Sequence, residues 1–142
     1  MHFAVLALDL EGTLISNAVS QIARPGLFNF LTRCKELVPR VVMFTTVPER
    51  RFRQIAMLLV DEGQAPDWFA ELEYVSWSGP TKNLNFIHGT EVHQALLVDD
   101  FEAYVHPGQE QQCVLAEHFD YPYRDTDTGL AEALNVLDQK LG

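Results

Sequence analysis

Continuous apolar runs that end in polar residues recur along the chain and predict its strands. Residues 3–8 are all apolar and lead directly into Asp9, a pattern typical of a strand buried on both faces of a parallel sheet. Runs of the same character occupy residues 41–44, 95–98 and 113–115. Residues 72–77 are rich in aromatic and β-branched types, which favour a further strand. The pattern therefore predicts five strands.

Apolar residues at helical spacing fill three of the intervals around these strands. A first helix opens after Pro25-Gly26, and its spacing is carried by Leu27, Phe30, Leu31, Cys34 and Leu37 or Val38. A second helix is predicted to begin with a capping box from Thr46 to Glu49 and to stop at Gly63. Asp127 or Thr128 is expected to cap a last helix, whose apolar stripe comprises Leu130, Ala133, Leu134, Leu137 and Leu141.

Strand and helix alternate along the chain without a linker or an internal repeat. The alternation predicts one α/β domain over residues 1–142, with a mostly parallel central sheet and helices on both faces. Folds of this kind place their chemistry at the carboxyl ends of the strands.

The amino-acid composition limits the kinds of partner that we expect for the protein. The 142 residues include 20 acids and 10 bases, giving a net charge of -10 that falls mostly on the second half. Such a surface repels a nucleic-acid backbone, and it suits either cation binding or solubility. Cys34 and Cys113 predict no disulfide framework. No run approaches the roughly 20 apolar residues of a membrane span, so we expect a cytoplasmic protein with no membrane or nucleic-acid partner.

Reactive polar residues follow the predicted strands. The carboxylates at these positions are Asp9, Glu11, Asp99 and Asp100. Their mutual repulsion would cost several kcal/mol unless a cation sits among them, and oxygen ligands without His or Cys select Mg²⁺ before Ca²⁺. Thr45 after the second strand and Lys82 in a nearby loop add a hydroxyl donor and a positive charge. This composition suits a bound phosphoryl group.

The order of these residues resembles a known family. Asp9-x-Glu11-Gly12-Thr13, Thr45, Lys82 and Asp99-Asp100 follow one another at spacings of 36, 37 and 17 residues, like the four motifs of the haloacid dehalogenase (HAD) superfamily. Within it, Lys82-Asn-Leu84 and residues 97–102 most resemble the NLI-interacting-factor type, which includes phosphatases of the RNA polymerase carboxy-terminal domain. The resemblance implies a three-layer, Rossmann-like HAD fold over residues 1–142.

The resemblance also implies roles for the two acids of the first motif. Asp9 corresponds to the nucleophile that forms an aspartyl-phosphate, which water then hydrolyses. Glu11 corresponds to the general acid and base, and its backbone carbonyl would ligate the metal. Most phosphatases of the family carry Asp at this position. Because the longer side chain moves the carboxyl by over an angstrom, a second hypothesis is a HAD-like binding domain with weak or no turnover.

The remaining motif residues would hold the phosphate and the metal. By the resemblance, Thr45 and Lys82 contact the phosphoryl oxygens, with Thr46 as the alternative to Thr45. Asp99 and Asp100 join Asp9 and Glu11 around Mg²⁺, one of the pair binding directly and the other directly or through water. A receiver domain uses similar groups, but there the acidic pair comes first along the chain, whereas here it comes last.

The intervals between the motifs leave no room for a cap domain. About a dozen residues separate Thr13 from the first helix, and a helix and a strand fill the stretch from Thr45 to Lys82. We therefore expect a capless, open site suited to a phosphate on a protein or another bulky carrier. Three arginines after Thr45 form either a solvated helix face or a grip for further phosphates: Arg50, Arg51 and Arg53.

The histidines fit no metal-ligand spacing. We expect structural or surface positions for His2, His88, His93, His106 and His118. His88 and His106 flank motif segments and are the two that can approach the mouth of the site.

Overall fold

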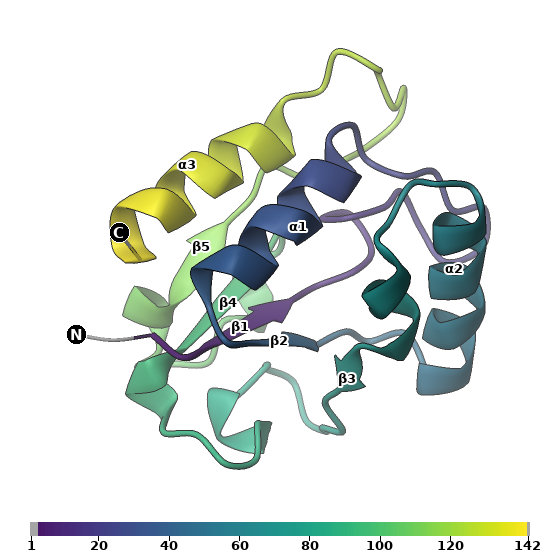
Figure 1. The fold of residues 1–142 in the computed structure, drawn as a ribbon. Helices are drawn as coiled ribbons and strands as arrows, with labels where there is room; N and C mark the ends of the chain where they lie inside the picture. The colour runs from purple at the N-terminus through teal and green to yellow at the C-terminus, as the bar shows by residue number, and fades with distance from the viewer. Residues whose placement is uncertain (1–2, 142) are drawn as a thin grey trace.

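The structure, a computed structural model, describes residues 3–141 of the chain (Figure 1). Its strands are β1 (Val5–Leu8), β2 (Arg40–Met43), β3 (Glu73–Tyr74), β4 (Ala95–Asp99) and β5 (Cys113–Leu115). Its α-helices are α1 (Leu27–Leu37), α2 (Glu49–Asp61) and α3 (Gly129–Leu141). The elements occur in the predicted order, and short 3₁₀ helices connect β3 to β4 and β4 to β5.

All five strands run parallel, and β1 lies at the centre of the sheet. The strand order is β3-β2-β1-β4-β5. Leu8, the last residue of β1, lies opposite Met43 of β2 and Val98 of β4. The chain therefore leaves these three strands at the same edge of the sheet, and the residues that follow them are brought together there.

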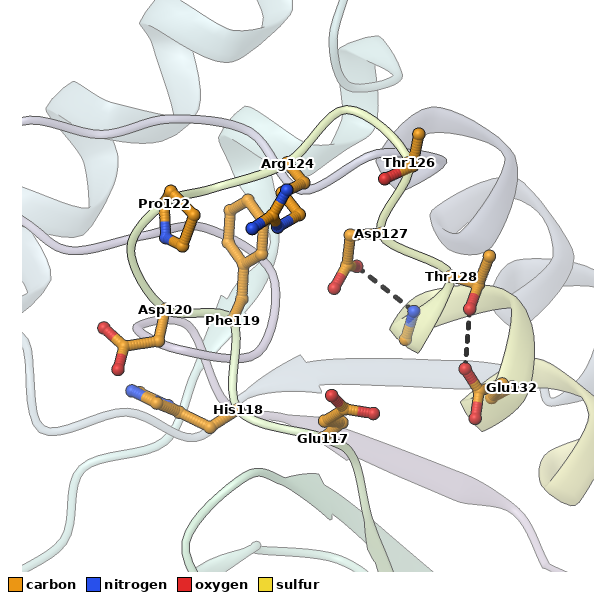
Figure 2. A pocket seen from close by; sticks show the side chains of 11 residues that line it. Glu117, His118, Phe119, Asp120, Pro122, Arg124, Thr126, Asp127, Thr128 and Glu132 are labelled. Carbon is orange, nitrogen blue, oxygen red and sulfur yellow. Dashed lines mark hydrogen bonds between the residues drawn. The ribbon is translucent and has the colours of Figure 1, made fainter.

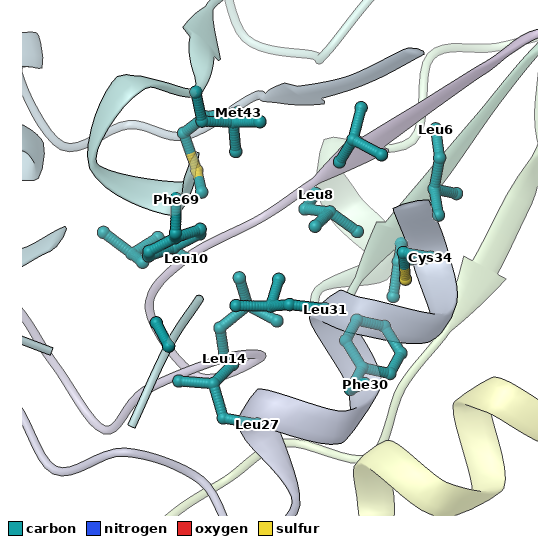
Figure 3. Close-up of a cluster of buried hydrophobic side chains, with 14 of the residues drawn as sticks. Leu6, Leu8, Leu10, Leu14, Leu27, Phe30, Leu31, Cys34, Met43 and Phe69 are labelled. Atoms are coloured by element: carbon teal, nitrogen blue, oxygen red, sulfur yellow. The ribbon is translucent and has the colours of Figure 1, made fainter. Parts of the chain in front are cut away.

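One face of the sheet carries all three α-helices. Leu6 and Leu8 of β1 belong to a buried cluster that includes Phe30 and Leu31 of α1 (Figure 3). Side chains of α2 and α3 belong to the same cluster, and α1 and α3 lie side by side (Figure 1). Apolar faces at helical spacing thus bury themselves against the alternate residues of the strands.

The other face is covered by 3₁₀ helices and loops. Val5 and Ala7 of β1 belong to a second cluster, to which the 3₁₀ helices Leu84–Phe86 and Val92–Gln94 contribute. The predicted α/β class and parallel sheet are confirmed. The structure differs from the prediction on this second face, which no α-helix covers among the described residues. The connections there are too irregular to show a helical period in the sequence.

β3 is shorter than the strand predicted over residues 72–77. Pairing with β2 extends one residue past Tyr74, where Val75 N–H donates to the Met43 carbonyl at 2.9 Å. Beyond it, the Trp77 ring packs edge-on against Phe44, with 5.4 Å between the ring centroids. The aromatic content that favours a strand here therefore serves side-chain packing instead. β1 likewise begins at Val5 rather than at residue 3.

The capping box predicted from Thr46 to Glu49 does not form. α2 begins at Glu49 after Pro48, and no side chain caps its first turn. A capping box needs its acid at the third helical position, whereas Glu49 occupies the first. The hydroxyl that bonds locally is that of Thr45, which accepts a hydrogen bond from Val47 N–H at 3.1 Å.

α3 begins where Asp127, of the two predicted candidates, caps its first free N–H group. Asp127 Oδ2 accepts a hydrogen bond from Gly129 N–H at 3.1 Å, while the Thr128 hydroxyl donates to Glu132 at 2.7 Å. Asp127 Oδ2 also lies 2.7 Å from Nε of the buried Arg24. A side chain at Gly129 would overlap the Arg24 guanidinium, so the start of α3 can pack on it only with glycine there.

Neither of the two intervals considered for a cap domain builds a second domain within residues 3–141. The first, residues 14–26, is a loop, and the second, residues 44–83, holds α2, a 3₁₀ helix and β3. Among the described helices, none has the length and apolar character needed to cross a membrane.

Candidate active site

Asp9 follows the central strand, with its carboxylate between an ammonium group and a hydroxyl. Lys82 Nζ lies 2.7 Å from Asp9 Oδ1, and the Thr13 hydroxyl lies 2.8 Å from Asp9 Oδ2. Lys82 Nζ also lies 2.6 Å from Oδ2 of Asp99, the last residue of β4. Lys82 and Asp99 are fully buried, and the backbone N–H of Lys82 donates to the Tyr104 carbonyl at 2.7 Å. The structure thus brings together three residues that the sequence placed on separate segments.

Asp100 is held beside Asp9 by two further side chains. The Thr13 hydroxyl lies 2.9 Å from Asp100 Oδ1, and His118 Nδ1 lies 2.5 Å from Asp100 Oδ2. Gly12 makes room for this pair, because a Cβ there would overlap Asp100 Oδ2 and lie 2.6 Å from His118 Nδ1. Its φ of 76° lies in the left-handed region that favours glycine. The glycine of the first motif is therefore required for both backbone and steric reasons.

The three carboxylates form a compact, oxygen-only set. One ligand atom each from Asp9, Asp99 and Asp100 can be chosen so that all lie within 4.8 Å of one another. Burial raises the pKa of Asp9 well above its usual range; Lys82 opposes this shift and Asp99 adds to it. Burial also raises the pKa of Asp99, against the attraction of Lys82. When ionised, three carboxylates and one ammonium leave two negative charges, so the donor set fits a single Mg²⁺ ion.

The surroundings of Lys82 and Asp100, the other two charged groups of this cluster, favour their ionised forms. Burial acts to lower the pKa of Lys82, but the attraction of Asp9 and then of Asp99 outweighs it and the pKa is raised. For Asp100, burial acts to raise the pKa, but hydrogen bonds with Asp9, His118 and Thr13 outweigh it and the pKa is lowered. Lys82 is therefore a fixed cation at neutral pH, and Asp100 is a fixed anion.

A cavity of about 460 Å³ opens in front of Asp9. Its wall comprises Asp9, Glu11, Thr46, Asp100, Phe101, Tyr104 and His118. Lys82 and Asp99 are fully buried and are not part of this wall. A ligand that enters the cavity therefore meets the carboxylates of Asp9 and Asp100 first.

Glu11 lines the cavity and is anchored at one oxygen. Its Oε2 accepts a hydrogen bond from Ala18 N–H at 2.6 Å, and the carbonyl of Ala18 accepts one from Arg51 Nε at 2.9 Å. A single residue of the 14–26 loop, Ala18, is thus held at both its N–H and its carbonyl. Arg51 is engaged in this clamp, Arg53 donates to the Leu72 carbonyl at 2.6 Å, and Arg50 is exposed. Neither Arg51 nor Arg53 is free to grip a phosphate.

The two threonines after β2 occupy different positions. Thr45 is buried, with its hydroxyl engaged by Val47 N–H and its carbonyl by the indole N–H of Trp77 at 2.8 Å. Thr46 is exposed and lines the cavity with Asp9. The capping box that assigned Thr46 a structural task is absent. The geometry therefore leaves both hydroxyls as candidate donors.

The family comparison covers nearly the whole chain. Residues 4–142 match the family described as NLI interacting factor-like phosphatase. The chain belongs to this family. The predicted resemblance to NLI-interacting-factor phosphatases of the HAD type is thereby confirmed, and it accounts for the order of the motifs along the sheet.

Two solved structures share the fold of this NLI interacting factor-like phosphatase chain. A variant of the fission yeast RNA polymerase II CTD phosphatase Fcp1 bound to beryllium fluoride matches at 15% identity and a TM-score of 0.59, over 98% of this chain and 50% of that one. A structure of Fcp1, described as an essential RNA polymerase II CTD phosphatase, matches at 14% identity and a TM-score of 0.62, over 97% of this chain and 50% of that one. The chain spans about half the length of both. No curated protein sequence matches it closely.

His118 is a residue of the candidate site that sequence reasoning missed. It bonds Asp100, whereas His106, one of the two expected near the mouth, lies 2.7 Å from the Thr81 hydroxyl through Nδ1. His2 lies outside the described residues. No spacing of residues in the sequence indicates His118, because the segment that carries it reaches the site through backbone pairing. Phe119 N–H donates to the Gly12 carbonyl at 2.8 Å.

Arg24 is a second residue that no local pattern marks. Its Nη1 donates to the carbonyl of Thr13 at 3.1 Å, and its Nε donates to Asp127, 103 positions away in sequence. The guanidinium also lies over the ring of Phe119, 5.3 Å from its centroid. Arg24 therefore joins the first motif to the start of α3.

A second cavity, of about 390 Å³, adjoins the first at His118 (Figure 2). It lies between the segment before α3 and the first turn of that helix. Its acidic residues include Asp127, which is paired with Arg24, and Glu132, which accepts the Thr128 hydroxyl. Asp9 and Lys82 of the candidate site are not among its lining residues.

Proposed function

We propose that the chain is a Mg²⁺-dependent phosphohydrolase that works through an aspartyl-phosphate on Asp9. One observation carries the proposal: the Asp9 carboxylate lines the cavity while Lys82 Nζ holds one of its oxygens at 2.7 Å and the Thr13 hydroxyl lies 2.8 Å from the other. A carboxylate held in one orientation is prepared for in-line attack on phosphorus. Membership of a phosphatase family supports the assignment. So does the beryllium fluoride, a phosphoryl mimic, in one Fcp1 structure.

Two displacements complete the reaction. An Asp9 oxygen forms a bond to phosphorus, the bond to the leaving oxygen breaks, and a proton from Glu11 neutralises that oxygen. Glu11 then takes a proton from a water molecule, whose oxygen attacks phosphorus and releases Asp9 and inorganic phosphate. Glu11 suits this role because it lines the cavity beside Asp9, and its bond to Ala18 N–H is made through Oε2, which leaves Oε1 as the oxygen that would transfer the proton.

Lys82 and a threonine hydroxyl act on the charge of the nucleophile and of the phosphoryl group. Lys82 offsets the charge of Asp9, which would otherwise repel an anionic substrate. The resemblance assigns the hydroxyl that contacts the phosphoryl group to Thr45, and the position of Thr46 on the cavity wall makes it the alternative donor.

Mg²⁺ fits between the carboxylates that face the cavity. We assign Asp9 and Asp100 as direct ligands, with the Glu11 carbonyl beside them, because both side chains line the cavity. Asp99 accepts hydrogen bonds from Lys82 at Oδ2 and from Phe101 N–H at Oδ1, so it would help to hold the ion only indirectly, through water. The ion would neutralise charge on the transferring phosphoryl oxygens.

The substrate we propose is a phosphate carried by a protein segment. The cavity lies at the surface at one edge of the sheet, and the intervals where a cap would sit hold a loop and a single helix with short turns. An uncapped site admits a bulky carrier.

One observation favours a second candidate, a binding domain without turnover. Glu11 is held at 2.6 Å by Ala18 N–H, and a proton donor that cannot leave this bond would not reach the leaving oxygen.

The test is hydrolysis of p-nitrophenyl phosphate and of phosphopeptides by the wild-type chain and by Asp9→Asn, with Mg²⁺ or with EDTA. We expect Mg²⁺-dependent turnover that falls at least a thousandfold in Asp9→Asn, while the variant keeps its circular dichroism spectrum. Phosphopeptide binding without turnover by the wild-type chain would instead establish the binding domain.

A further inference from the structure

Two aromatic side chains form one wall of the Asp9 cavity. Phe101 and Tyr104 both line it, with ring centroids 5.0 Å apart and ring planes at 81°. Tyr104 in turn packs edge-on against Trp77, with centroids 6.3 Å apart. Although Phe101 has this support, it remains 52% exposed. The cavity of a polar, charge-rich site thus presents a large apolar ring to solvent.

This aromatic wall, Phe101 and Tyr104, is tied directly to the reactive groups. Phe101 N–H donates to Asp99 Oδ1 at 3.0 Å, and the Tyr104 carbonyl accepts the backbone N–H of Lys82 at 2.7 Å. Lys82 Nζ lies 4.9 Å from the centroid of the Tyr104 ring. The position of the wall is therefore set by the same bonds that set the position of the Asp9, Lys82 and Asp99 charges.

We propose that Phe101 is a specificity-determining residue that contacts the leaving group and makes phosphotyrosine in a protein segment the preferred substrate over phosphoserine. The inference rests on the proposed function. In-line attack by Asp9 directs the leaving group away from Asp9 and into the cavity, and Phe101 and Tyr104 are the two aromatic residues of the cavity wall. A phenol ring covers the exposed ring of Phe101, whereas the single methylene of a serine leaves it exposed.

The hydrogen bond of Glu11 points to the same substrate. When the phosphorus–oxygen bond breaks, the phenolic oxygen takes the electron pair and then a proton. Tyrosine has a pKa near 10, far below that of an aliphatic alcohol, so its departure needs less help from a general acid. If its bond to Ala18 N–H restrains Glu11 as a general acid, the rate of hydrolysis falls less for an aryl leaving group than for an alkyl one.

The experiment compares two peptides of identical flanking sequence, one with phosphotyrosine and one with phosphoserine. kcat/KM is measured for both with the full chain and Mg²⁺, in the wild type, Phe101→Ala and Phe28→Ala. Phe28 is a matched control because it is a phenylalanine of similar exposure, 49%, on α1 and outside the cavity wall. Comparing the ratio between variants cancels the intrinsic difference in reactivity of the two esters.

We expect the phosphotyrosine to phosphoserine ratio to fall roughly threefold to tenfold in Phe101→Ala, as the loss of one aromatic pair implies, and to stay unchanged in Phe28→Ala. Phe101→Leu, which keeps apolar area without a ring, should fall between them. An unchanged ratio in Phe101→Ala with both peptides still hydrolysed overturns the inference and leaves the phosphatase intact. Hydrolysis of neither peptide by the wild type overturns the proposed function and the inference with it.

Discussion

At the scale of single residues, Asp9 faces opposing demands. It must be ionised to attack phosphorus, yet burial raises its pKa and Asp99 adds to the shift. Lys82, 2.7 Å away, is the one nearby group that counters this, and it is shared with Asp99. A divalent cation beside Asp9 would therefore do more than bind phosphate, because it would also keep the nucleophile ionised.

This raised pKa predicts how pH and Mg²⁺ act on stability. A carboxyl whose pKa is higher in the folded than in the unfolded state stabilises the fold below its unfolded pKa, near 4, and loses that contribution as pH rises through the folded pKa. In EDTA, urea unfolding should therefore show this contribution declining from pH 4 toward pH 7. Mg²⁺ should add more stability at pH 7 than at pH 5, because at pH 5 it competes with the bound proton.

The matched control for this prediction is Asp9→Asn, which removes the titrating group. The difference in Mg²⁺ stabilisation between pH 5 and pH 7 should shrink in this variant. Equal Mg²⁺ stabilisation of the wild type at both pH values would contradict the assignment.

Sequence could locate residues that follow strands, but not those that reach the site from afar. Asp9, Asp99 and Asp100 were predictable because each follows an apolar run, and parallel strands end at one edge. His118 and Arg24 were not, since their partners lie 18 and 103 positions away and no periodic pattern connects them. The choice between Thr45 and Thr46 likewise depended on a capping box that the start of α2 does not form.

At the scale of elements, one buried ion pair connects α3 to the loop after β1. Arg24 is fully buried, bonds Asp127 at 2.7 Å, and contacts Thr13 through its carbonyl at 3.1 Å. Thr13 in turn lies between Asp9 and Asp100. The start of α3, which contributes no motif residue, therefore helps to fix the position of the first motif.

Arg24→Met should destabilise the chain by about 3 to 5 kcal/mol, because removal of one partner leaves Asp127 without its countercharge and the Thr13 carbonyl without its donor. The change is measured by urea unfolding of Arg24→Met made in the Asp9→Asn background, with Asp9→Asn alone as the reference. Arg33→Met is the control, since Arg33 pairs with Glu36 and with Asp138 of α3 in ion pairs that are exposed to solvent, and its loss should shift the midpoint little. Equal midpoints for the two variants would refute the anchoring role.

The elements themselves were largely predictable, and the differences have local causes. Buried strands and amphipathic helices each carry a strong period, so five strands and three helices were expected where they occur. β3 fell short because Trp77 packs against Phe44 instead of extending the strand. The face without α-helices could not be foreseen, because 3₁₀ helices such as Leu84–Phe86 are too brief to show a period.

At the scale of the whole molecule, the two thiols lie on opposite sides of the sheet, Cys34 buried and Cys113 partly buried. Cys34 of α1 is fully buried in the cluster beneath the three helices, and Cys113 of β5 packs against the cluster on the other face. Burial raises the pKa of each thiol to about 12. Their reactivity therefore reports on both sides of the sheet at once.

Native chain at pH 8 should react with iodoacetamide at least a thousandfold more slowly than chain in 6 M urea, because with a pKa of about 12 only roughly one thiol in ten thousand is a thiolate. Mass spectrometry of timed samples gives both rates. Rapid labelling of Cys34 in the native chain would show that α1 opens without global unfolding.

The bonds from His118 to Asp100 and from Asp127 to Arg24 bear on how far the chain can be shortened. A fragment that stopped after residue 112 would keep every residue to which we assign a chemical role. It would nevertheless lack β5, His118, which bonds Asp100, and Asp127, which is the countercharge of Arg24. The last thirty or so residues thus act as scaffolding for chemistry that we assign to residues between Asp9 and Tyr104, and minimal versions of this domain must retain them.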